Sequence, residues 1–582
     1  MTETRSGTRP PVGTSLNPLL GCLLLLAGCT AVITDEALPW TAVDPQGRPV
    51  PGVNVTTGAG AAGSAASPGS KPASSGSASP AAAGSCDTER LSARAVLVAP
   101  RQYVNVLRDL LGPMAVSEQD AATSSELIFD TVDRPQLTTA TLDRIVRLAE
   151  GATGSIKGKT ASVLGCSNLA DTACVRKGIG SLARRAFKRP VAQDELDQLM
   201  ALRDMGAQLE PNDQTETGTL AALQAVLIAP STLYRTEFTA PVQGQARSLN
   251  AHERAAALAA LLLDSGPDEA LLMAADDGSL ANEAGVIREI DRLLKLPRVR
   301  TQLTTAILTA YNVQRVFNTP KDAKLYPDYT AQLQNSMYEE TRRFVEDVLW
   351  TRNAPLSELL TSRRSFVDAP LAKLYGVPAP RTPFEPTMLP PERAGLLTQA
   401  SVMSVLSRPD KTSVVARGLF VRGNLLCLPK IPGPPTSVLT AVAMQLEEDA
   451  TQRDLAAYRA KTSPCMGCHA QFDRFGLLLE QFDAIGRHLP AQSMPVDFTG
   501  LAQLDGVAAD VGELAGRVQK DQLFERCLSD RALGYALTIA PDSQNRCLQN
   551  LRDPDKLAKA TIRDLIVAVA TSPQFTTRSG EP

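Results

Sequence analysis

The apolar residues of this chain recur at the three-, four- and seven-residue spacing of an amphipathic helix. Leu333, Met337, Phe344 and Val348 follow this spacing, and charged residues occupy many of the positions between them. Aromatic residues make up only 4% of the chain, and the apolar share is mostly Ala and Leu. This composition favours helices over strands. We therefore predict a mainly α fold.

Length and charge set two further limits. A chain of 582 residues is expected to form several domains, because one hydrophobic core stops growing at about 250–300 residues. The 59 basic and 62 acidic residues leave a net charge of −3. Nucleic-acid binding normally requires a basic patch or a basic domain. We therefore expect no nucleic-acid partner.

The first residues have the pattern of an export signal. Arg5 and Arg9 precede a short apolar run that ends in Leu-Ala-Gly at 26–28 and then Cys29. A charged start, a short apolar segment and small residues are typical of a secretory signal peptide. The ending resembles a bacterial lipobox, which implies cleavage before Cys29 and lipidation of its thiol. The alternative is an ordinary signal peptide that happens to contain Cys.

The run at 19–26 is too short to cross a bilayer, which needs about 20 apolar residues, and no second long run follows. We expect no transmembrane helix in the mature chain. Residues 29–87 are rich in Gly, Ala, Ser and Pro. Such a segment cannot bury enough apolar surface to offset chain entropy and is predicted to be a disordered tether. The expected location is the cell envelope, facing the periplasm or the cell surface.

The strongest chemical motif is Cys465-Met-Gly-Cys468-His469. Two thiols separated by two residues can form thioethers to both vinyl groups of a haem, and the adjacent His then supplies the proximal imidazole. This predicts one covalent haem c, attached at Cys465 and Cys468 with His469 on the iron. The alternatives are a redox disulfide, half of a zinc site or a structural pair. No βαβ pattern and no second ligand pair accompany the motif.

A distal iron ligand is harder to choose. Met403 lies upstream of the motif and Met494 downstream, and His488 is a weaker candidate. Met more often packs in a core than binds a metal, and an open distal position is the other possibility. The first-turn His252 is expected at the surface. The acids Asp473, Glu480 and Asp483 could be acid/base groups but are expected on a solvated helix face or at caps. The basic cluster around Arg184 and Lys188 could bind an anion but is expected on a charged helix face.

The remaining cysteines suggest disulfides, which persist outside the cytoplasm. After Cys22 in the signal, Cys29 and the two haem thiols, six are left, an even number. Proximity in sequence favours Cys166–Cys174 and Cys527–Cys547, which leaves Cys86 and Cys427.

The order of several short segments resembles a known family. The segments are residues 101–103, 107–112, 183–190, 233–235, 249–263, 267–268, 339–341, 393–401, 412–413, 417–418, 427, the haem motif, 475–476, 480–487, 505–506, 527 and 535–537. Together they resemble a bacterial family of multi-domain cytochrome-like proteins, abundant in planctomycetes and myxobacteria. It is built from consecutive domains of unknown function: DUF1587, DUF1595, DUF1592, DUF1588 and DUF1585.

This resemblance covers roughly residues 90–580 and implies an exported, mainly helical protein with one haem motif, but no known reaction. Many relatives have Met-Asp-Pro where this chain has Phe472-Asp473-Arg474, so a Met ligand at that place is excluded here. The expected order is a lipoprotein signal peptide at 1–28, a linker at 29–87, helical domains at 88–165, 166–240 and 245–380, a haem-motif domain at 392–490 with its cytochrome-like segment near 455–490, and a C-terminal helical domain at 500–578.

The function expected from these features is electron transfer or redox chemistry with a redox partner that the sequence does not identify. One rival is a haem enzyme, of the peroxidase or oxygenase kind, with an open distal side. The other is a helical binding or scaffold lipoprotein in which haem is incidental or absent.

Overall fold

The computed structural model describes residues 91–117, 128, 136–208, 213–238, 246–429, 431, 451–463, 465–501, 504–539, 551 and 553–579. These residues belong to one compact unit, Ser85–Pro582, and the other unit is Met1–Gly84. The expected signal peptide, the linker at 29–87 and Cys29 lie outside the described residues, as do Cys86 and Cys547. Among the described helices, none combines the length and apolar content that crossing a membrane requires.

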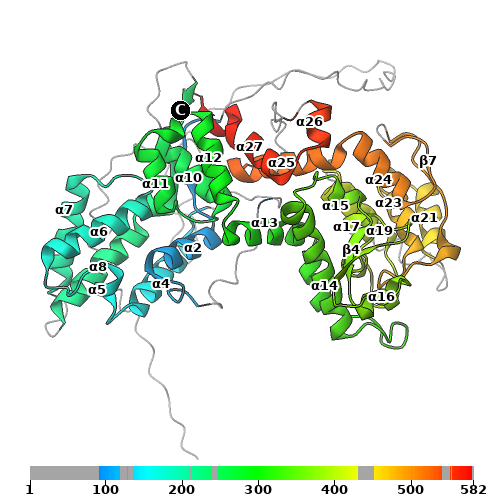
Figure 1. The fold of residues 1–582 in the computed structure, drawn as a ribbon, viewed down its shortest axis with the longest axis horizontal. Coiled ribbons are helices and arrows are strands. Elements are labelled where there is room, and N and C mark those ends of the chain that lie inside the picture. Colours follow the sequence, from blue (N-terminus) through cyan, green and yellow to red (C-terminus); the bar gives the residue numbers. More distant parts are fainter. Residues whose placement is uncertain are drawn as a thin grey trace, which may run out of the picture. The chain divides into compact units, whose positions relative to one another are not determined.

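The prediction of a mainly α fold is confirmed (Figure 1). The first group of elements lies before residue 240. Its members are β1 (Arg94–Leu97), α2 (Pro100–Leu111), α4 (Thr139–Ser155), α5 (Thr160–Val163), α6 (Thr172–Phe187), α7 (Gln193–Gly206), α8 (Gln214–Ile228), α9 (Pro230–Leu233) and β2 (Tyr234–Glu237).

The central group is also helical. It contains β3 (Arg247–Ser248), α10 (Ala251–Leu262), α11 (Glu269–Asp276), η1 (Ser279–Ala281), α12 (Glu283–Leu293), α13 (Pro297–Ala310), η2 (Val313–Asn318), α14 (Ala331–Glu346), the π-helical turn η3 (Asp347–Thr351), α15 (Glu358–Thr361), β4 (Arg364–Val367), α16 (Ala369–Tyr375) and β5 (Glu385–Met388).

The segment with the cysteine motif follows. Its elements are α17 (Gly395–Thr398), α18 (Ala400–Val405), α19 (Val414–Phe420), the π-helical turn η4 (Val421–Leu425), α21 (Gln452–Lys461), α22 (Cys465–His469), α23 (Asp473–Leu478), η5 (Leu479–Gln481), η6 (Pro490–Gln492), β6 (Val496–Asp497) and β7 (Val507–Ala508). The chain ends with α24 (Val511–Lys520), α25 (Leu523–Leu537), α26 (Pro554–Ala558), α27 (Ile562–Thr571), α28 (Pro573–Thr576) and β8 (Thr577–Arg578).

Local signals account for many helix boundaries. Helix α10 begins at a capping box, in which Asn250 accepts from the Glu253 amide and the Glu253 carboxylate accepts from the Asn250 amide, both at 2.9 Å. The periodic segment that starts at Leu333 forms α14, whose apolar face is buried.

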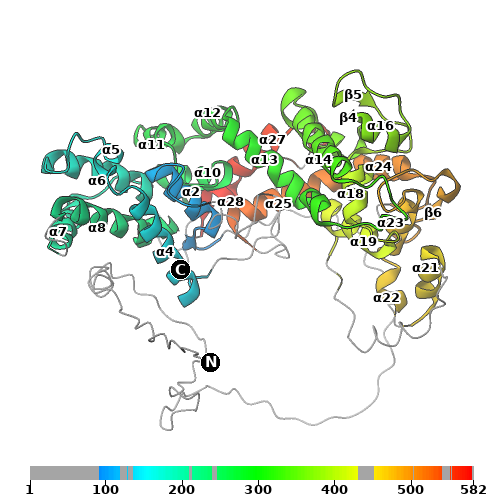
Figure 2. The same ribbon diagram turned by 90° about the horizontal axis from the view of Figure 1, so that it is seen from below.

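The strands join parts of the chain that are far apart in sequence. All four sheets among the described residues are antiparallel pairs: β1 with β2, β3 with β8, β4 with β5 and β6 with β7. The β3–β8 pair brings the C-terminal strand back to the start of the central group. Helix α27 likewise packs on α12 (Figures 1 and 2). One hydrophobic cluster therefore runs from the central helices to the C-terminal ones.

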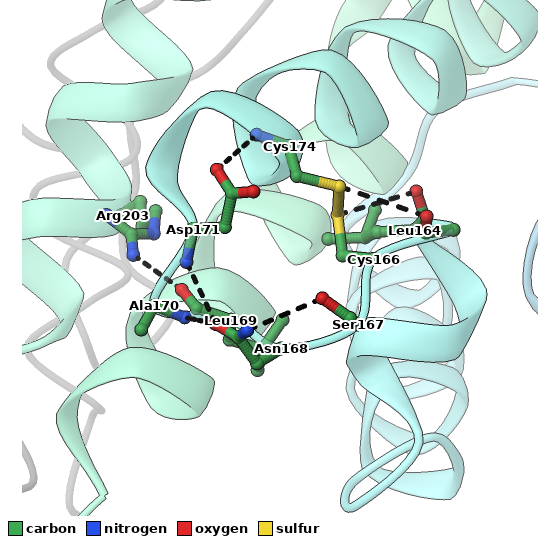
Figure 3. Close-up of a disulfide and its surroundings, with 10 residues drawn as sticks. Leu164, Cys166, Ser167, Asn168, Leu169, Ala170, Asp171, Cys174 and Arg203 are labelled. Carbon is green, nitrogen blue, oxygen red and sulfur yellow. Dashed lines mark hydrogen bonds between the residues drawn. A yellow bond between two sulfur atoms is a disulfide. The ribbon is translucent and has the colours of Figure 1, made fainter.

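Two disulfides are present in the described part of the chain. Cys166 and Cys174 form the expected short-range bond, and Figure 3 shows Asp171 beside it, accepting from the Cys174 amide at 3.0 Å. The expected Cys527–Cys547 bond is wrong, because Cys527 is bonded to Cys427. Turn η4 packs on α25 and brings together two cysteines that are 100 residues apart. Proximity in sequence could not reveal this pair.

A buried carboxyl group in the central helices makes stability depend on pH. Glu340 on α14 is fully buried and accepts from Ser365 Oγ at 2.7 Å and Tyr375 Oη at 2.6 Å. Burial raises its pKa from 4.5 to about 7. The unfolded chain releases this proton near pH 4.5 and the folded chain near pH 7, so the folded state binds more protons between these values and stability falls as the pH rises.

We expect this group to lower the free energy of unfolding by about 3 kcal/mol between pH 4.5 and 7. The variant Glu340→Gln carries no titrating proton and should lose that part of the pH slope. Urea unfolding of both proteins at several pH values measures how the free energy of unfolding changes with pH. The same pH dependence in the two proteins would contradict a raised pKa of Glu340.

Candidate functional site

The two motif cysteines lie on one short helix. Helix α22 covers the whole motif, Cys465–His469, and packs against α21 (Figure 2). Residues three and four apart share a helix face, so Cys468 and His469 lie on the same side as Cys465. Both thiols are free, Cys465 buried and Cys468 partly exposed. The cysteines are therefore placed for two parallel attachments beside one imidazole.

His469 is held by a carboxylate. Its Nδ1 lies 3.1 Å from both oxygens of Asp473, one helical turn further along. Its ring contacts the Phe472 ring at 4.8 Å between centroids. Within the described part of the chain, Nε2 makes no hydrogen bond. A metal-binding His commonly bonds through its second nitrogen to a carboxylate or carbonyl, which fixes the tautomer and the ring plane. This arrangement leaves Nε2 as the available ligand atom.

The carboxylate is itself fixed by a cation. Arg459 of α21 donates from Nε to Asp473 Oδ2 at 3.0 Å, and both side chains are largely buried. The charges of Arg459 and Asp473 therefore compensate each other behind His469. Sequence reasoning placed Asp473 on a solvated face or at a cap and missed Arg459. The four-residue spacing of His469 and Asp473 was the available signal.

Two glycines, Gly418 on α19 and Gly476 on α23, allow the segment after the motif to pack closely on α19. Helices α19 and α23 approach so closely that a Cβ on Gly476 would lie 1.9 Å from the Val414 carbonyl oxygen, and one on Gly418 would lie 2.1 Å from the Phe472 carbonyl oxygen. Only hydrogen fits at these two positions. The backbone of α19 thus sets the position of Phe472 and, next to it, Asp473.

A buried arginine fixes the next turns. Arg417 of α19 is fully buried and donates to the carbonyl oxygens of Leu479 and Phe482 at 2.7 Å and of Asp483 at 2.8 Å. Its burial lowers its pKa. Glu480, which accepts from Arg417 and Thr412, completes this cluster. Glu480 is largely buried against Arg417 rather than on a solvated face, which corrects the expectation for that residue. Asp483 Oδ1 accepts from the backbone amides of Ile485 at 2.9 Å and Arg487 at 2.8 Å, which is a capping role of the expected kind.

The candidate distal ligands occupy different environments. Met403 on α18 is fully buried in the hydrophobic core, and Met494, which follows η6, is half exposed. His488 Nδ1 lies 3.2 Å from Glu392 and Nε2 lies 3.4 Å from Ser493 Oγ. Burial lowers the pKa of His488, although Glu392 opposes this. His252 is partly exposed and pairs with the exposed Asp276, which agrees with the expected place at the surface.

The donor set has the groups that covalent attachment of haem c requires. Cys465 and Cys468 are unbonded to each other, and the described residues hold no cluster of three His, Cys, Asp or Glu side chains suited to a metal ion. Two free thiols followed by an imidazole with one free nitrogen are the groups that covalent haem attachment uses. The residues present therefore fit this cofactor.

Three family models match the chain, each described as a protein of unknown function. PSD5 (DUF1595) matches residues 174–237, PSD4 (DUF1592) matches 249–377, and PSCyt3 (DUF1588) matches 393–491, which includes the cysteine motif. No curated protein and no solved structure matches. The chain therefore contains segments that match DUF1595, DUF1592 and DUF1588, in this order.

Proposed function

We propose that this protein is an exported, lipid-anchored carrier of one covalent haem c that acts in electron transfer or another redox reaction. The observation that carries the proposal is the single turn of α22, which presents two free thiols beside His469. Cys465 and Cys468 would hold the haem and His469 would bind its iron. The haem, when bound, supplies one-electron chemistry.

The chain's own residues set the environment of that centre. Asp473, held by Arg459, orients the His469 ring and makes it a more basic ligand. Helix α19 holds the following segment in place through Gly418 and Arg417. Ligand basicity and solvent access are the means by which a protein tunes a redox centre.

Covalent attachment is tested by a pyridine haemochrome spectrum of the full chain, expressed with a c-type maturation system. We expect the α-band of a thioether-linked haem, shifted in Cys465→Ala and in Cys468→Ala and lost when both are replaced. Met466→Ala, between the two cysteines, is the matched control and should keep the wild-type band. Absence of covalent haem from the wild-type protein would contradict the proposal. The remaining hypothesis would then be a helical binding or scaffold lipoprotein.

A haem enzyme with an open distal position is the second candidate function, and the His469–Asp473 hydrogen bond favours it. A more basic imidazole stabilises oxidised iron, whereas Met ligation raises the potential and suits a carrier. A high-spin oxidised spectrum that changes on adding cyanide indicates the enzyme. A low-spin spectrum that Met494→Ala converts to high spin indicates a carrier ligated by Met494.

Asp473 should lower the midpoint potential of the bound haem. Asp473→Asn removes the carboxylate's charge but keeps the side chain's size, and we expect the potential to rise by about 60–120 mV, which corresponds to a 10- to 100-fold change in ligand strength at 59 mV per decade. Spectroelectrochemical titration measures this. Gln471→Ala, partly exposed in the same turn, is the control. An unchanged potential with haem retained contradicts a tuning role for Asp473.

The lipid anchor is tested separately. Replacing Cys29 with Ser removes the only thiol of the lipobox-like sequence, so the chain should move from the membrane fraction to the soluble envelope fraction and lose incorporated labelled fatty acid. Cys22→Ser, within the same expected signal peptide, is the matched control and should stay in the membrane fraction. Membrane retention of Cys29→Ser with no loss of label contradicts the anchor.

A further inference from the structure

A small cavity lies where the beginning, the middle and the end of the described chain meet. Its walls come from β1, α2, β2, α10 and the end of α25. Its polar lining includes Gln102, Lys188, Arg235, Ser265 and Tyr535, and its apolar lining includes Val106 and Leu261. Gln102, Lys188, Arg235 and Tyr535 belong to four of the segments that carry the family resemblance. The motif at Cys465 contributes nothing to it.

Positive charge exceeds negative charge around this cavity. Glu237 is fully buried and is contacted by three guanidinium groups: Arg94 at 2.8 Å, Arg578 at 2.6 Å and Arg235 at 3.2 Å. Lys188, expected on a charged helix face, is instead buried. Three guanidinium groups thus share one carboxylate, and Lys188 lines the same cavity. Burying charge without compensation is costly. Additional negative or partly negative groups near these cations would therefore stabilise the folded protein.

Main-chain carbonyls provide part of the compensation. Lys188 Nζ donates to carbonyl oxygens of Ser231 at 2.7 Å and Thr232 at 2.9 Å, and Arg235 donates to that of Ala536 at 3.4 Å. Carbonyl oxygens carry only partial charges. Burial still lowers the pKa of Lys188 to about 7. Arg235 is 6% exposed, and its Nε is buried without a hydrogen-bond partner.

The opposite side of the cavity is polar but neutral. Tyr535 Oη lies 3.3 Å from Asp264 Oδ1 and 3.4 Å from Gln102 Nε2. Asp264 is paired with Arg101 at 2.8 Å, so its charge is already compensated. Asp264 also has a positive φ of 52°, a conformation that costs energy in a residue other than glycine and is often found at ligand sites.

We propose that this cavity binds a short-chain monocarboxylate of two or three carbons, with its carboxylate on Arg235 and its alkyl end against Val106 and Leu261. The volume of about 40 Å³ equals roughly three to four water-sized spaces, which is the size of acetate or propionate and too small for a nucleotide or a sugar. The planar guanidinium of Arg suits a carboxylate, which it can bind through two parallel hydrogen bonds.

The test is thermal unfolding of the full chain with formate, acetate, propionate, butyrate, hexanoate or chloride at equal ionic strength. A ligand that binds only the folded state raises the melting temperature. We expect a saturating rise of about 2 °C or more with acetate and propionate, a smaller one with formate and butyrate, and none with hexanoate beyond that of chloride. Ala260→Leu, which fills the cavity from α10, should abolish it.

Ala251→Leu, on the same helix but outside the cavity lining, is the matched control and should keep the rise. Arg235→Met should also abolish the rise in melting temperature. If this variant does not fold, the result for Ala260→Leu still tests whether the carboxylate binds in this cavity. An equal rise with chloride, or an unchanged rise in a folded Ala260→Leu protein, overturns the proposal. The outcome is independent of haem attachment.

Discussion

Replacing Gly476 with Ala is expected to destabilise the protein by about 3 kcal/mol or more, and to separate Asp473 from His469. The added Cβ would lie 1.9 Å from the Val414 carbonyl oxygen, so the backbones of α19 and α23 must move apart. Overpacking a core with a movable side chain costs about 1–3 kcal/mol, and here the obstacle is backbone, which cannot rotate away. Urea unfolding measures the loss.

Gly516 provides the matched control. It lies inside α24 with no atom within 4 Å of an added Cβ, and Gly to Ala within a helix stabilises by about 0.5–1 kcal/mol. The two substitutions are chemically identical, so opposite signs in the free energy of unfolding isolate the close contact. If Gly476→Ala changes the free energy of unfolding by the same amount as Gly516→Ala, α19 and α23 are not in close backbone contact at Gly476.

Removing the Cys427–Cys527 disulfide is the second large expected effect. The bond closes a loop of 100 residues, and this loop contains the motif helix α22. The bond joins Cys427, just after η4, to Cys527 of α25. In the chain-entropy account, a loop of that length stabilises by about 4.7 kcal/mol, because the cross-link restricts the unfolded chain. Replacing both Cys427 and Cys527 with Ser should lower the free energy of unfolding by about this amount.

The other disulfide provides the comparison. Cys166 and Cys174 close a loop of 8 residues, for which the same account predicts about 2.5 kcal/mol. Its double Ser variant should therefore lose roughly half as much stability. Equal losses in the two double variants, or a larger loss for the short loop, would show that strain or unfolded-state structure dominates rather than loop closure. Free-thiol titration of each variant confirms which bond was removed.

The helices could be predicted because their signals are local. The capping box at Asn250, the apolar spacing from Leu333 to Val348 and the scarcity of alternating β-branched runs depend on residues within one or two turns of each other. The short disulfide Cys166–Cys174 is local in the same sense. The prediction of a Cys527–Cys547 bond was wrong for the opposite reason, since the true partner lies 100 residues away.

The candidate site also has features that the sequence could predict and features that it could not. The two thiols and the imidazole are visible as a five-residue motif, because they are close neighbours in the sequence. Arg459, which holds Asp473, and Arg417, which holds the turns after the motif, could not be predicted. Each acts across a contact between helices, and neither position differs in sequence from an ordinary surface arginine.

By itself, therefore, the amino-acid sequence determined the helical class and the spacing of the donor groups in the motif, since period, capping and donor spacing are properties of neighbouring residues. Only the tertiary structure decided which cysteine pairs with Cys527, which cation holds Asp473, and that Lys188 and Arg235 meet at one buried cavity. These features depend on long-range packing, in which a buried charge or thiol takes whichever partner the assembled helices bring within reach.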